Sequence, residues 1–406
     1  MLEGFEIKEP LFAEERMEER FRVEFEKAVD FFGNTDESVR EVDMSVEGRE
    51  PEAIGRVLAA VAAEETVLLS SNRWGALTRE AFSRASRSPA PSGSILIRTG
   101  GSSGEPKFAI HTWSSLETAA RNLWFRMGRE PISSFLDLPL FHVSGWMPVV
   151  RGLISGGRLG LGHDRRFENF PGARVTSIVP TTLYRSLQCS QTVGLLKQMD
   201  WIFAGGAAFS PELLNRAREE ELPISLVYGM TETGGMVALQ HPEEFMAGDP
   251  PTVTAFSQNE LTVDEEGEIE IRSDQLFRGY LGRAPRESAS WKTGDLGQFT
   301  SPGCLEIRGR KGRFLSSGGE TVSLGKIEAA AKNIKGVKDA FVAALPSEEW
   351  GSSTLLFVEG DHLQNRDLRE ELKLVLDPPE VPAQVRVVKE IPRSGLGKVD
   401  MDRLLG

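Results

Sequence analysis

The segment from Thr99 to Lys107 has the composition and order of a phosphate-binding loop. Five small residues follow Thr99, namely Gly100, Gly101, Ser102, Ser103 and Gly104. Without bulky side chains, the backbone can approach a ligand closely and point its N–H groups at the oxygens of a polyphosphate. Lys107 adds a positive charge. The segment is not a Walker A loop, because it lacks Gly-Lys-Ser/Thr, and a plain flexible turn is the alternative.

Three later segments carry other groups that could act on a phosphate ester. Tyr228-Gly-Met-Thr-Glu-Thr-Gly234 contains Glu232, and a Mg²⁺ ion that bridges phosphate oxygens needs at least one such carboxylate. Trp291-Lys-Thr-Gly-Asp295 ends in another carboxylate, and Ile391-Pro-Arg-Ser-Gly-Leu-Gly-Lys398 ends in a lysine. An exposed turn and a solvated chain end are the ordinary explanations of the last two.

Together these segments resemble the signature motifs of the adenylate-forming acyl- and aryl-CoA synthetases. The order Thr-x-Gly-Ser-Ser-Gly-x-Pro-Lys at Thr99–Lys107 is similar to the family's phosphate motif. Ala204-Gly205-Gly206-Ala207 is similar to its turn of small residues that lines the adenine pocket. The resemblance extends from about residue 95 to 403, and it implies an enzyme that activates a carboxylic acid with ATP.

The resemblance also implies a role for each matched residue. Tyr228 would stack on adenine, Thr231 would contact phosphate and Glu232 would hold Mg²⁺, the last two within the catalytic machinery. Asp295 would accept hydrogen bonds from both ribose hydroxyls, with Arg310 as a second ribose contact. The residues expected to bind ATP are Thr99, Gly100, Gly101, Ser102, Ser103, Gly104, Lys107, Gly205, Gly206, Ala207, Tyr228, Gly229, Met230, Thr231, Asp295 and Arg310.

Lys398 resembles the family's mobile catalytic lysine, which approaches the carboxylate and the α-phosphate during adenylation. A cation there would stabilise the charge that develops at the reaction centre. The smaller domain would then turn about a hinge at residues 310–312, with Gly312 at the pivot. Gly318 and Gly319 would afterwards lie beside the path of the coenzyme A pantetheine.

The acid itself is indicated by Leu138-Pro-Leu-Phe-His-Val-Ser-Gly145, which is similar to the 2-succinylbenzoate–CoA ligases within this family. These ligases serve menaquinone and phylloquinone biosynthesis, and their histidine at this position borders the acyl pocket, a catalytic role that falls here to His142. A second substrate carboxylate would need a cation or several donors; Arg151 is the candidate, and a salt bridge elsewhere is the alternative. The predicted substrate-binding residues are His142, Ser144, Arg151, Gly206 and Gly229.

We therefore expect two half-reactions, formation of an acyl-adenylate from Mg·ATP and the acid, and transfer of the acyl group to coenzyme A. Another aryl- or acyl-CoA ligase of the same family is the nearest alternative. A nucleotide-binding homologue without catalysis is an alternative of a different class. Lys107, Thr231, Glu232, Asp295 and Lys398 are all retained, which argues against it.

The elements around these motifs predict an α/β fold with two domains. Strand-like runs alternate with helical ones in the region that carries most motifs: Ser134–Leu138, Arg174–Val179, Trp201–Ala204 and Ile224–Tyr228. Residues 250–308 read as a small antiparallel β unit. The C-terminal region reads as α+β, with helices at Lys326–Lys332 and Leu363–Leu376 and strands at Ala340–Ala344 and Thr354–Glu359.

These patterns give a large N-terminal adenylation domain of layered α/β subdomains at 1–309 and a smaller mobile domain at 313–406. A chain of 406 residues is long enough for at least two domains. Met17, Phe21, Phe25 and Val29 recur at helical spacing within Phe12–Phe32. We expect a trimmed first subdomain, because only about ninety residues precede the phosphate motif.

Charge and composition limit the partners. The net charge of −13 argues against non-specific binding to nucleic acid or anionic membranes, which need basic patches. Cys189 and Cys304 match no zinc spacing and suit a reducing cytoplasm. No leader peptide is expected, because the first twenty residues alternate charges and lack an apolar core segment. No membrane span is expected, because the longest apolar stretches are about strand length. The expected partners are ATP, coenzyme A and a small aromatic acid, and the oligomeric state stays open, a homo-oligomer included.

The chain departs from the family pattern at three further places. The phosphate motif has Gly100 where serine is usual, and it has Ser102 and Ser103 where threonines are usual. Gly312 stands where the hinge commonly has Asp or Lys, and it should turn freely with less preference for either state. Leu324-Gly325-Lys326 replaces a usual Pro-x-Glu, which leaves the local conformation there open.

Overall fold

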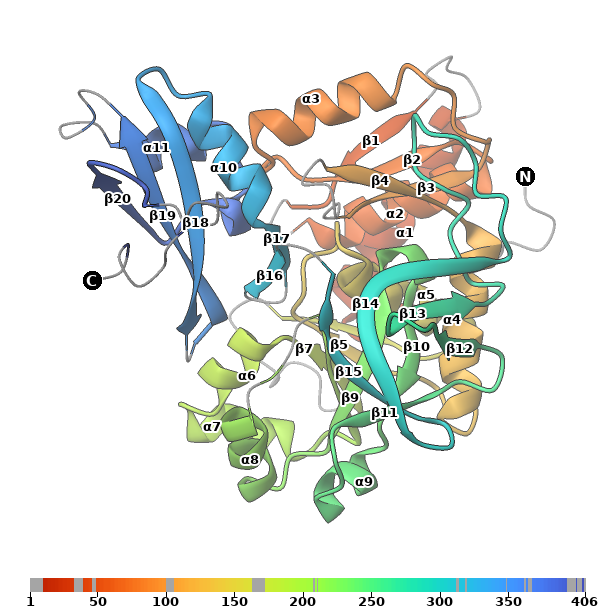
Figure 1. Cartoon of the computed structure of the whole chain (residues 1–406). Helices are drawn as coiled ribbons and strands as arrows, with labels where there is room; N and C mark the ends of the chain where they lie inside the picture. The colour runs from red at the N-terminus through yellow and green to blue at the C-terminus, as the bar shows by residue number, and fades with distance from the viewer. Residues whose placement is uncertain are drawn as a thin grey trace.

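A computed structural model gives the fold as a large N-terminal part and a smaller C-terminal part (Figure 1). It describes residues 10–32, 39–45, 49–99, 106–162, 172–206, 209, 211–311, 314–317, 320–347, 349–360, 363, 367–392, 399 and 404. Among these, no helix is both long enough and apolar enough to cross a lipid bilayer.

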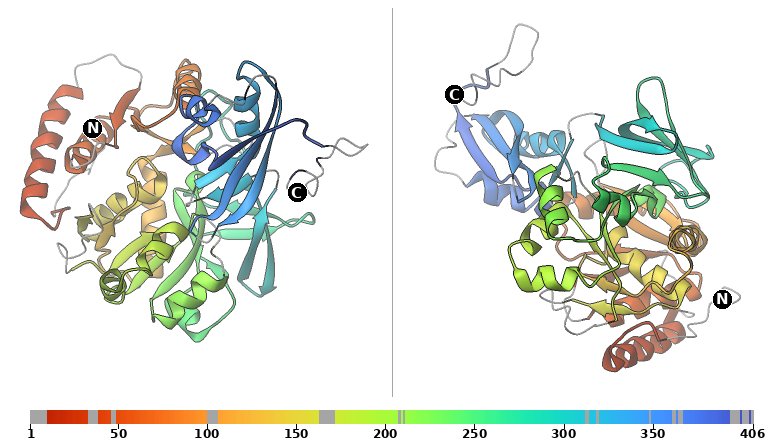
Figure 2. Two further views of the ribbon diagram at one scale, coloured as in Figure 1. Left: turned by 90° about the vertical axis from the view of Figure 1, so that its left-hand side faces the viewer. Right: turned by 90° about the horizontal axis from the view of Figure 1, so that it is seen from below.

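The N-terminal part begins with a four-stranded sheet in the order β1-β2-β3-β4. The first three strands run parallel and the fourth antiparallel. The strands are β1 (Arg40–Asp43), β2 (Val67–Ser70), β3 (Ser94–Thr99) and β4 (Lys107–Thr112). The accompanying helices are α1 (Glu15–Phe32), α2 (Glu50–Ala62) and α3 (Ala76–Ala85). Figure 2 shows α1 on the outer side of the molecule, apart from the C-terminal part.

Strand β3 is covered on both faces, and its last residue, Thr99, is the first residue of the phosphate motif. Ile95 and Ile97 point into the core formed with α2, whereas Leu96 points into a second core with Trp74 and Phe108. This alternation is the period of a strand, and both faces are apolar because both are covered. Packing on both faces therefore fixes the position of β3 up to Thr99.

The rest of the N-terminal part is an eleven-stranded sheet. Its parallel strands are β5 (Ser134–Leu136), β6 (Leu159–Leu161), β7 (Val175–Ile178), β8 (Trp201–Ala204) and β9 (Ile224–Met230). It continues antiparallel through β10 (Gly235–Leu239), β11 (Thr252–Ala255), β12 (Glu260–Val263), β13 (Glu268–Arg272), β14 (Ser290–Ser301) and β15 (Cys304–Arg310). The small β unit expected from the sequence is thus an extension of the main sheet, because β11 pairs with both β10 and β15.

Helices cover this sheet and join its strands. They are α4 (Trp113–Arg126), α5 (Val143–Ser155), α6 (Pro180–Ser186), α7 (Ser190–Leu196), α8 (Pro211–Glu219) and α9 (Pro242–Ala247). A short 3₁₀ turn, η2 (Thr231–Thr233), links β9 to β10. It carries the residues that the sequence assigns to phosphate and Mg²⁺.

The C-terminal part contains a hairpin and a three-stranded sheet with two helices. The hairpin is β16 (Phe314–Ser317) with β17 (Glu320–Ser323), and the sheet is β18 (Val337–Ser347), β19 (Gly351–Gly360) and β20 (Gln384–Val388). The helices are α10 (Leu324–Lys332) and α11 (Leu368–Lys373), followed by a 3₁₀ turn, η3 (Pro378–Glu380). Ile327 of α10 packs on Val342 and Leu356, and Leu77 of α3 packs on the same core.

The α/β fold class and the two-part organisation expected from the sequence are confirmed. Strand β8 has the predicted bounds. The helix expected at Leu363–Leu376 is wrong in its bounds, because α11 begins only after Asp367. The Asp367 carboxylate accepts a hydrogen bond from the Glu370 N–H at 3.1 Å, which caps the helix at this point.

Candidate active site

The candidate site lies where β3 and β4, the β9–η2–β10 connection and strand β14 approach one another. Thr99 at the end of β3 pairs with Lys107 at the start of β4. The two ends of the phosphate motif are therefore adjacent, as a closed loop requires. Gly100, Gly101, Ser102, Ser103 and Gly104 themselves lie outside the described residues.

Glu232 is the central carboxylate of the site and is only 6% exposed. Its Oε1 accepts hydrogen bonds from the Tyr280 hydroxyl at 2.6 Å and from the Thr99 hydroxyl at 3.4 Å. Within the described residues, no basic side chain forms an ion pair with it. A buried carboxylate held by neutral donors is a suitable ligand for a cation.

The described residues contain no cluster of three metal-ligating side chains. A Mg²⁺ ion bound through Glu232 would therefore take most of its ligands from phosphate oxygens and water, which is its usual behaviour in nucleotide sites. Glu232 thus fits the metal role that the sequence gives it. Thr231 precedes it in the same turn and lies half-buried.

The turn that carries Thr231 and Glu232 depends on a close backbone approach. A Cβ atom at Gly229 would stand 2.0 Å from the carbonyl oxygen of Gly235, so a side chain cannot be accommodated there. The main chains of β9 and β10 can approach this closely only with glycine at this position. Gly229 therefore sets the shape of the turn, in addition to the ligand contact predicted for it.

His111 of β4 supports the same turn, and sequence reasoning missed it. Its ring is fully buried, with Nε2 2.7 Å from the Thr231 carbonyl oxygen and Nδ1 3.1 Å from the Ser115 hydroxyl. Burial lowers its pKa to about 4, although the hydrogen bond to Thr231 opposes this. The neutral imidazole thus donates to Thr231, and only the fold reveals this contact.

The residues predicted to hold adenine and ribose are in contact. The Tyr228 hydroxyl donates a hydrogen bond to Oδ2 of Asp295 at 3.1 Å. Asp295 also stands opposite Arg310 in the β14–β15 register, so the backbone of both ribose candidates is adjacent. Lys107 lies 5.1 Å from the ring centre of Tyr280, which links the phosphate motif to the Glu232 partner. Tyr280 was not among the predicted site residues.

Helix α5 carries the residues predicted for the acyl group. Arg151 is 4% exposed, and its Nε has no hydrogen-bond partner in the described part of the chain. Its guanidinium lies 5.8 Å from the ring centre of Phe203. Burial lowers its pKa to about 10. The salt bridge considered as the alternative for Arg151 is not present among the described residues.

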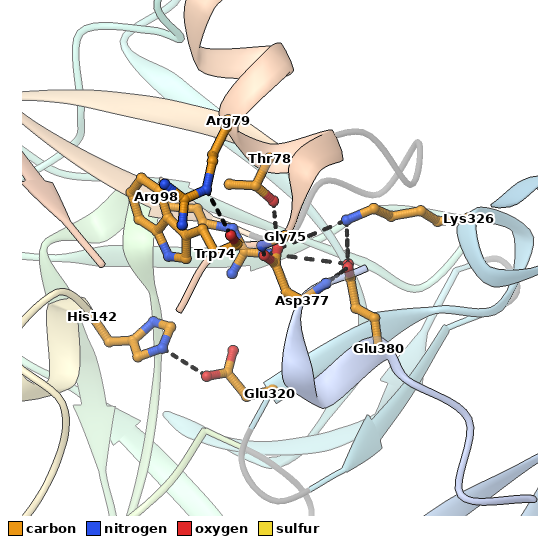
Figure 3. Close-up of polar contacts among 10 residues, drawn as sticks. All are labelled: Trp74, Gly75, Thr78, Arg79, Arg98, His142, Glu320, Lys326, Asp377 and Glu380. Atoms are coloured by element: carbon orange, nitrogen blue, oxygen red, sulfur yellow. Dashed lines mark hydrogen bonds and ion pairs between the residues drawn. The ribbon is translucent and has the colours of Figure 1, made fainter. Parts of the chain in front are cut away.

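His142 caps the other end of α5 and contacts the C-terminal part. Its Nε2 lies 2.7 Å from Oε1 of Glu320 in β17 (Figure 3). Burial alone would raise the pKa of Glu320, but His142 and then Arg98 lower it to about 2. Ser144, the second residue of α5, is exposed. The start of α5 therefore contacts strand β17 of the C-terminal part directly.

Lys326, one of the departures from the family pattern, has a clear partner. Its ammonium lies 2.6 Å from Oε1 of Glu380, and both side chains are buried. Burial lowers the pKa of Lys326, and the charge of Glu380 opposes this shift. Glu380 was not singled out from the sequence, because it lies 54 positions away along the chain.

The remaining predicted residues divide into three groups. Gly205 and Gly206 follow β8, and the Gly205 N–H donates to Ile178 at 3.2 Å, while Met230 ends β9. The predicted residues outside the described part are Gly100, Gly101, Ser102, Ser103, Gly104, Ala207, Gly312, Gly318, Gly319 and Lys398. For Arg310 the structure describes the backbone alone. The roles of all these residues stay predictions.

Two family models match the chain. The AMP-binding enzyme model matches residues 23–281, and the AMP-binding enzyme C-terminal domain model matches residues 326–398. The two matched segments include Glu232, Arg151 and Lys398, and they leave Asp295 and Glu320 between them.

Curated relatives carry a common description. A 2-succinylbenzoate–CoA ligase of Oceanobacillus iheyensis is 26% identical over 329 residues, which covers 75% of this chain and 68% of the relative. A 2-succinylbenzoate–CoA ligase of Listeria monocytogenes is 25% identical over 321 residues, which covers 76% of this chain and 69% of the relative.

Solved structures share the fold over most of the chain. A double mutant of o-succinylbenzoate CoA synthetase from Bacillus subtilis, bound with its product analogue, has a TM-score of 0.81 at 18% identity and covers 96% of this chain and 92% of its own. An amide bond synthetase from Marinactinospora thermotolerans has a TM-score of 0.80 at 18% identity and covers 96% and 94%. At this identity the likeness shows the fold.

Proposed function

Because the chain belongs to the AMP-binding enzyme family, we propose that it is an AMP-forming acid–CoA ligase whose acid is 2-succinylbenzoate. The reaction would be a step of menaquinone or phylloquinone biosynthesis in the cytoplasm. Its working parts would be an adenylation domain at 1–309, a hinge at 310–312 and a mobile domain at 313–406.

In the first half-reaction, a carboxylate oxygen of the acid attacks the α-phosphorus of ATP. The bond from that phosphorus to the bridging oxygen breaks, pyrophosphate leaves and an acyl-adenylate remains. Tyr228 and Asp295 hold the nucleoside, and the Thr99–Lys107 segment holds the phosphates. Lys398 brings a positive charge to the reacting oxygens. Holding the reactants in line supplies much of the acceleration.

Glu232 is the residue that would bind Mg²⁺, with Thr231 beside it on the phosphate side. When bound, the ion supplies charge stabilisation on the phosphate oxygens. Tyr280 and Thr99 orient the Glu232 carboxylate from one side through its Oε1. His111 keeps the turn in place through the Thr231 carbonyl oxygen.

In the second half-reaction, the thiol sulfur of coenzyme A attacks the acyl carbon. The bond between that carbon and the AMP oxygen breaks, so the thioester, AMP and the thiol proton are the products. The contact of His142 with Glu320 supports this assignment, because Glu320 directly follows the two glycines predicted to line the coenzyme A path, and His142 is predicted to border the acyl pocket. We infer that the arrangement of the two parts seen here is the one that serves thioester formation.

One observation carries the choice of acid. Arg151 is a buried cation without a carboxylate partner in the described residues, and it lies close to the turn that follows Glu232. A buried charge of this kind is stable only if a ligand or solvent compensates it. The second carboxylate of 2-succinylbenzoate would do so, whereas benzoate and fatty acids have no such group.

The test compares acids in the presence of ATP and coenzyme A. The enzyme should form AMP and a thioester from 2-succinylbenzoate far faster than from benzoate or a fatty acid. Arg151→Met should raise the KM for 2-succinylbenzoate by at least about tenfold and change benzoate turnover little, because it removes the partner of one carboxylate. Faster turnover of benzoate or a fatty acid by the unmodified enzyme would contradict the choice of acid.

A further inference from the structure

One of the contacts between the C-terminal and N-terminal parts is made by a short segment, Leu374–Asp377, which follows α11. This segment lies against the start of helix α3, and Figure 3 shows Asp377 among side chains from both parts. Arg79 of α3 braces the receiving loop, because its guanidinium donates to the carbonyl oxygens of Asn72 and Trp74 at 2.6 and 2.9 Å.

Helix α3 has its N-terminus capped by the other part of the molecule. Its first turn has no acidic residue, and no side chain of its own caps it. Instead the Gly75 N–H donates to Oδ1 of Asp377 at 2.6 Å. The Ala76 and Leu77 N–H groups donate to the carbonyl oxygens of Leu374 and Val375 at 3.4 and 3.1 Å. Free N–H groups at a helix start attract an anionic acceptor, so α3 is completed by docking.

The other oxygen of Asp377 faces two further donors. The Thr78 hydroxyl and Nη2 of Arg98 both donate to Oδ2. Asp377 is 2% exposed and Arg98 is 7% exposed, so the contact is sealed from water. A second buried ion pair, Lys326 with Glu380, lies beside the Arg98–Asp377 pair. Arg98 is 3.9 Å from Glu380, and Lys326 is 4.0 Å from Asp377.

The docked segment leaves no room for a side chain at position 75. A Cβ atom at Gly75 would stand 2.5 Å from the carbonyl oxygen of Leu376. The Gly75 backbone is extended, at φ −68° and ψ 166°, which any residue can adopt. The N-terminal part alone does not require glycine here; the docked C-terminal part does.

We propose that Asp377 is the docking residue that holds the C-terminal part in this arrangement, with Gly75, Thr78 and Arg98 as its socket. The inference rests on the proposed function, in which this arrangement serves thioester formation. Arg98 immediately precedes Thr99, so the socket adjoins the phosphate motif. Asp377 and its socket therefore determine how much of the enzyme is in the thioester-forming state.

The physical chemistry of the pair suits a reversible contact. When the two parts separate, Arg98 and Asp377 both regain water, so opening leaves no charge buried without a partner. When one partner is removed by mutation, docking would bury the other charge alone. Loss of either partner should therefore disfavour the docked state strongly while leaving each part folded.

The first test is Gly75→Ala, because the added methyl group clashes only in the docked state. Thioester formation from preformed acyl-adenylate and coenzyme A should slow by at least about tenfold. Pyrophosphate release from ATP and 2-succinylbenzoate without coenzyme A should stay within about twofold. Gly194→Ala is the matched control, because a Cβ at Gly194 of α7 meets no atom within 4 Å; it should change neither rate.

The second test removes the charge and keeps the shape. Asp377→Asn should show the same split between the two half-reactions, because its single amide oxygen cannot replace both carboxylate oxygens and it carries no charge to pair with Arg98. Asp339→Asn is its control, because Asp339 pairs with Lys332 at 2.8 Å within the C-terminal part, away from α3. Equal loss of both half-reactions in Gly75→Ala and Asp377→Asn, or no change in either, would overturn the proposal.

A distance measurement keeps the inference separate from the proposed function. One spin label is placed at the exposed Cys189 of the N-terminal part and the other at Gln384→Cys of the C-terminal part, so that the distance between the two parts is measured. Cys304→Ser removes the other native cysteine. The parent should give one main distance, and Gly75→Ala should add a second population. Identical distributions would overturn the docking role. Absence of adenylate formation in the unmodified enzyme would overturn the proposed function and leave this measurement decisive for docking.

Discussion

At the residue scale, two buried charged side chains of the candidate site contact uncharged groups. Glu232 is bound by the Tyr280 and Thr99 hydroxyls, and Arg151 faces the Phe203 ring. In the described residues neither forms an ion pair. Their opposite charges thus remain available to ligands of opposite sign, a cation at Glu232 and an anion at Arg151. His111 is different, because burial keeps it neutral and its task is to hold the turn.

His111 gives a pH dependence with a defined sign. The native ring stays neutral down to pH about 4, whereas the unfolded chain takes up this proton near pH 6.5. Between these values the unfolded state binds more protons, so the free energy of unfolding falls by about 3 kcal/mol as the pH drops from 6.5 to 4. Urea unfolding at several pH values measures this slope.

Two variants separate the contributions of His111. His111→Gln can still donate to the Thr231 carbonyl oxygen but does not titrate, so it should flatten the pH slope and retain most adenylate formation. His111→Leu leaves that oxygen without its donor and should slow adenylate formation by about tenfold or more. The role fails if the Leu and Gln variants have equal rates, or if the slope is unchanged in both.

At the scale of elements, the turn between β9 and β10 depends on close main-chain contact. Gly229→Ala would place a methyl group 2.0 Å from the Gly235 carbonyl oxygen. The turn must then shift and displace Thr231 and Glu232, with about 1–3 kcal/mol lost in stability. Adenylate formation should fall at least about tenfold. Gly194→Ala is the control, and an unchanged rate in Gly229→Ala would contradict this role of the glycine.

The local sequence pattern predicted where strands and helices lie better than it predicted which residues they contact. Strand β8 could be predicted because its apolar residues are contiguous. Helix α11 is shorter than predicted, because the apolar residues Val375 and Leu376 after it serve docking rather than continuing the helix. A periodic pattern does not distinguish these two uses of an apolar residue.

The candidate site could be predicted only where its residues lie in recognisable strings. The contact of Tyr228 with Asp295 joins two such strings, whereas Tyr280, the partner of Glu232, lies outside them. His111 and the Arg98–Asp377 pair could not be predicted, because the partners are 120 and 279 positions apart. Only the pairing of strands and the docking of the two parts brings them together.

At the scale of the whole molecule, the two parts meet through few contacts of unequal strength. Asp377 is sealed from water, whereas Arg185 and Glu349 form an ion pair in which both side chains stay well exposed. Exposed pairs contribute little, so the sealed contact should decide the arrangement. The chain has a net charge of −13, and the proposed substrates are anionic, so their binding would need local cations; Lys107, Arg151 and Lys398 are the ones proposed.

The central claim is that the carboxylate becomes an acyl-adenylate before the thioester forms. The direct measurement uses 2-succinylbenzoate labelled with ¹⁸O in its carboxylates, together with ATP and coenzyme A. Attack of the carboxylate on the α-phosphorus transfers one labelled oxygen to each AMP, and mass spectrometry of the AMP should detect it. AMP without label, or label in released phosphate or pyrophosphate, would contradict the account.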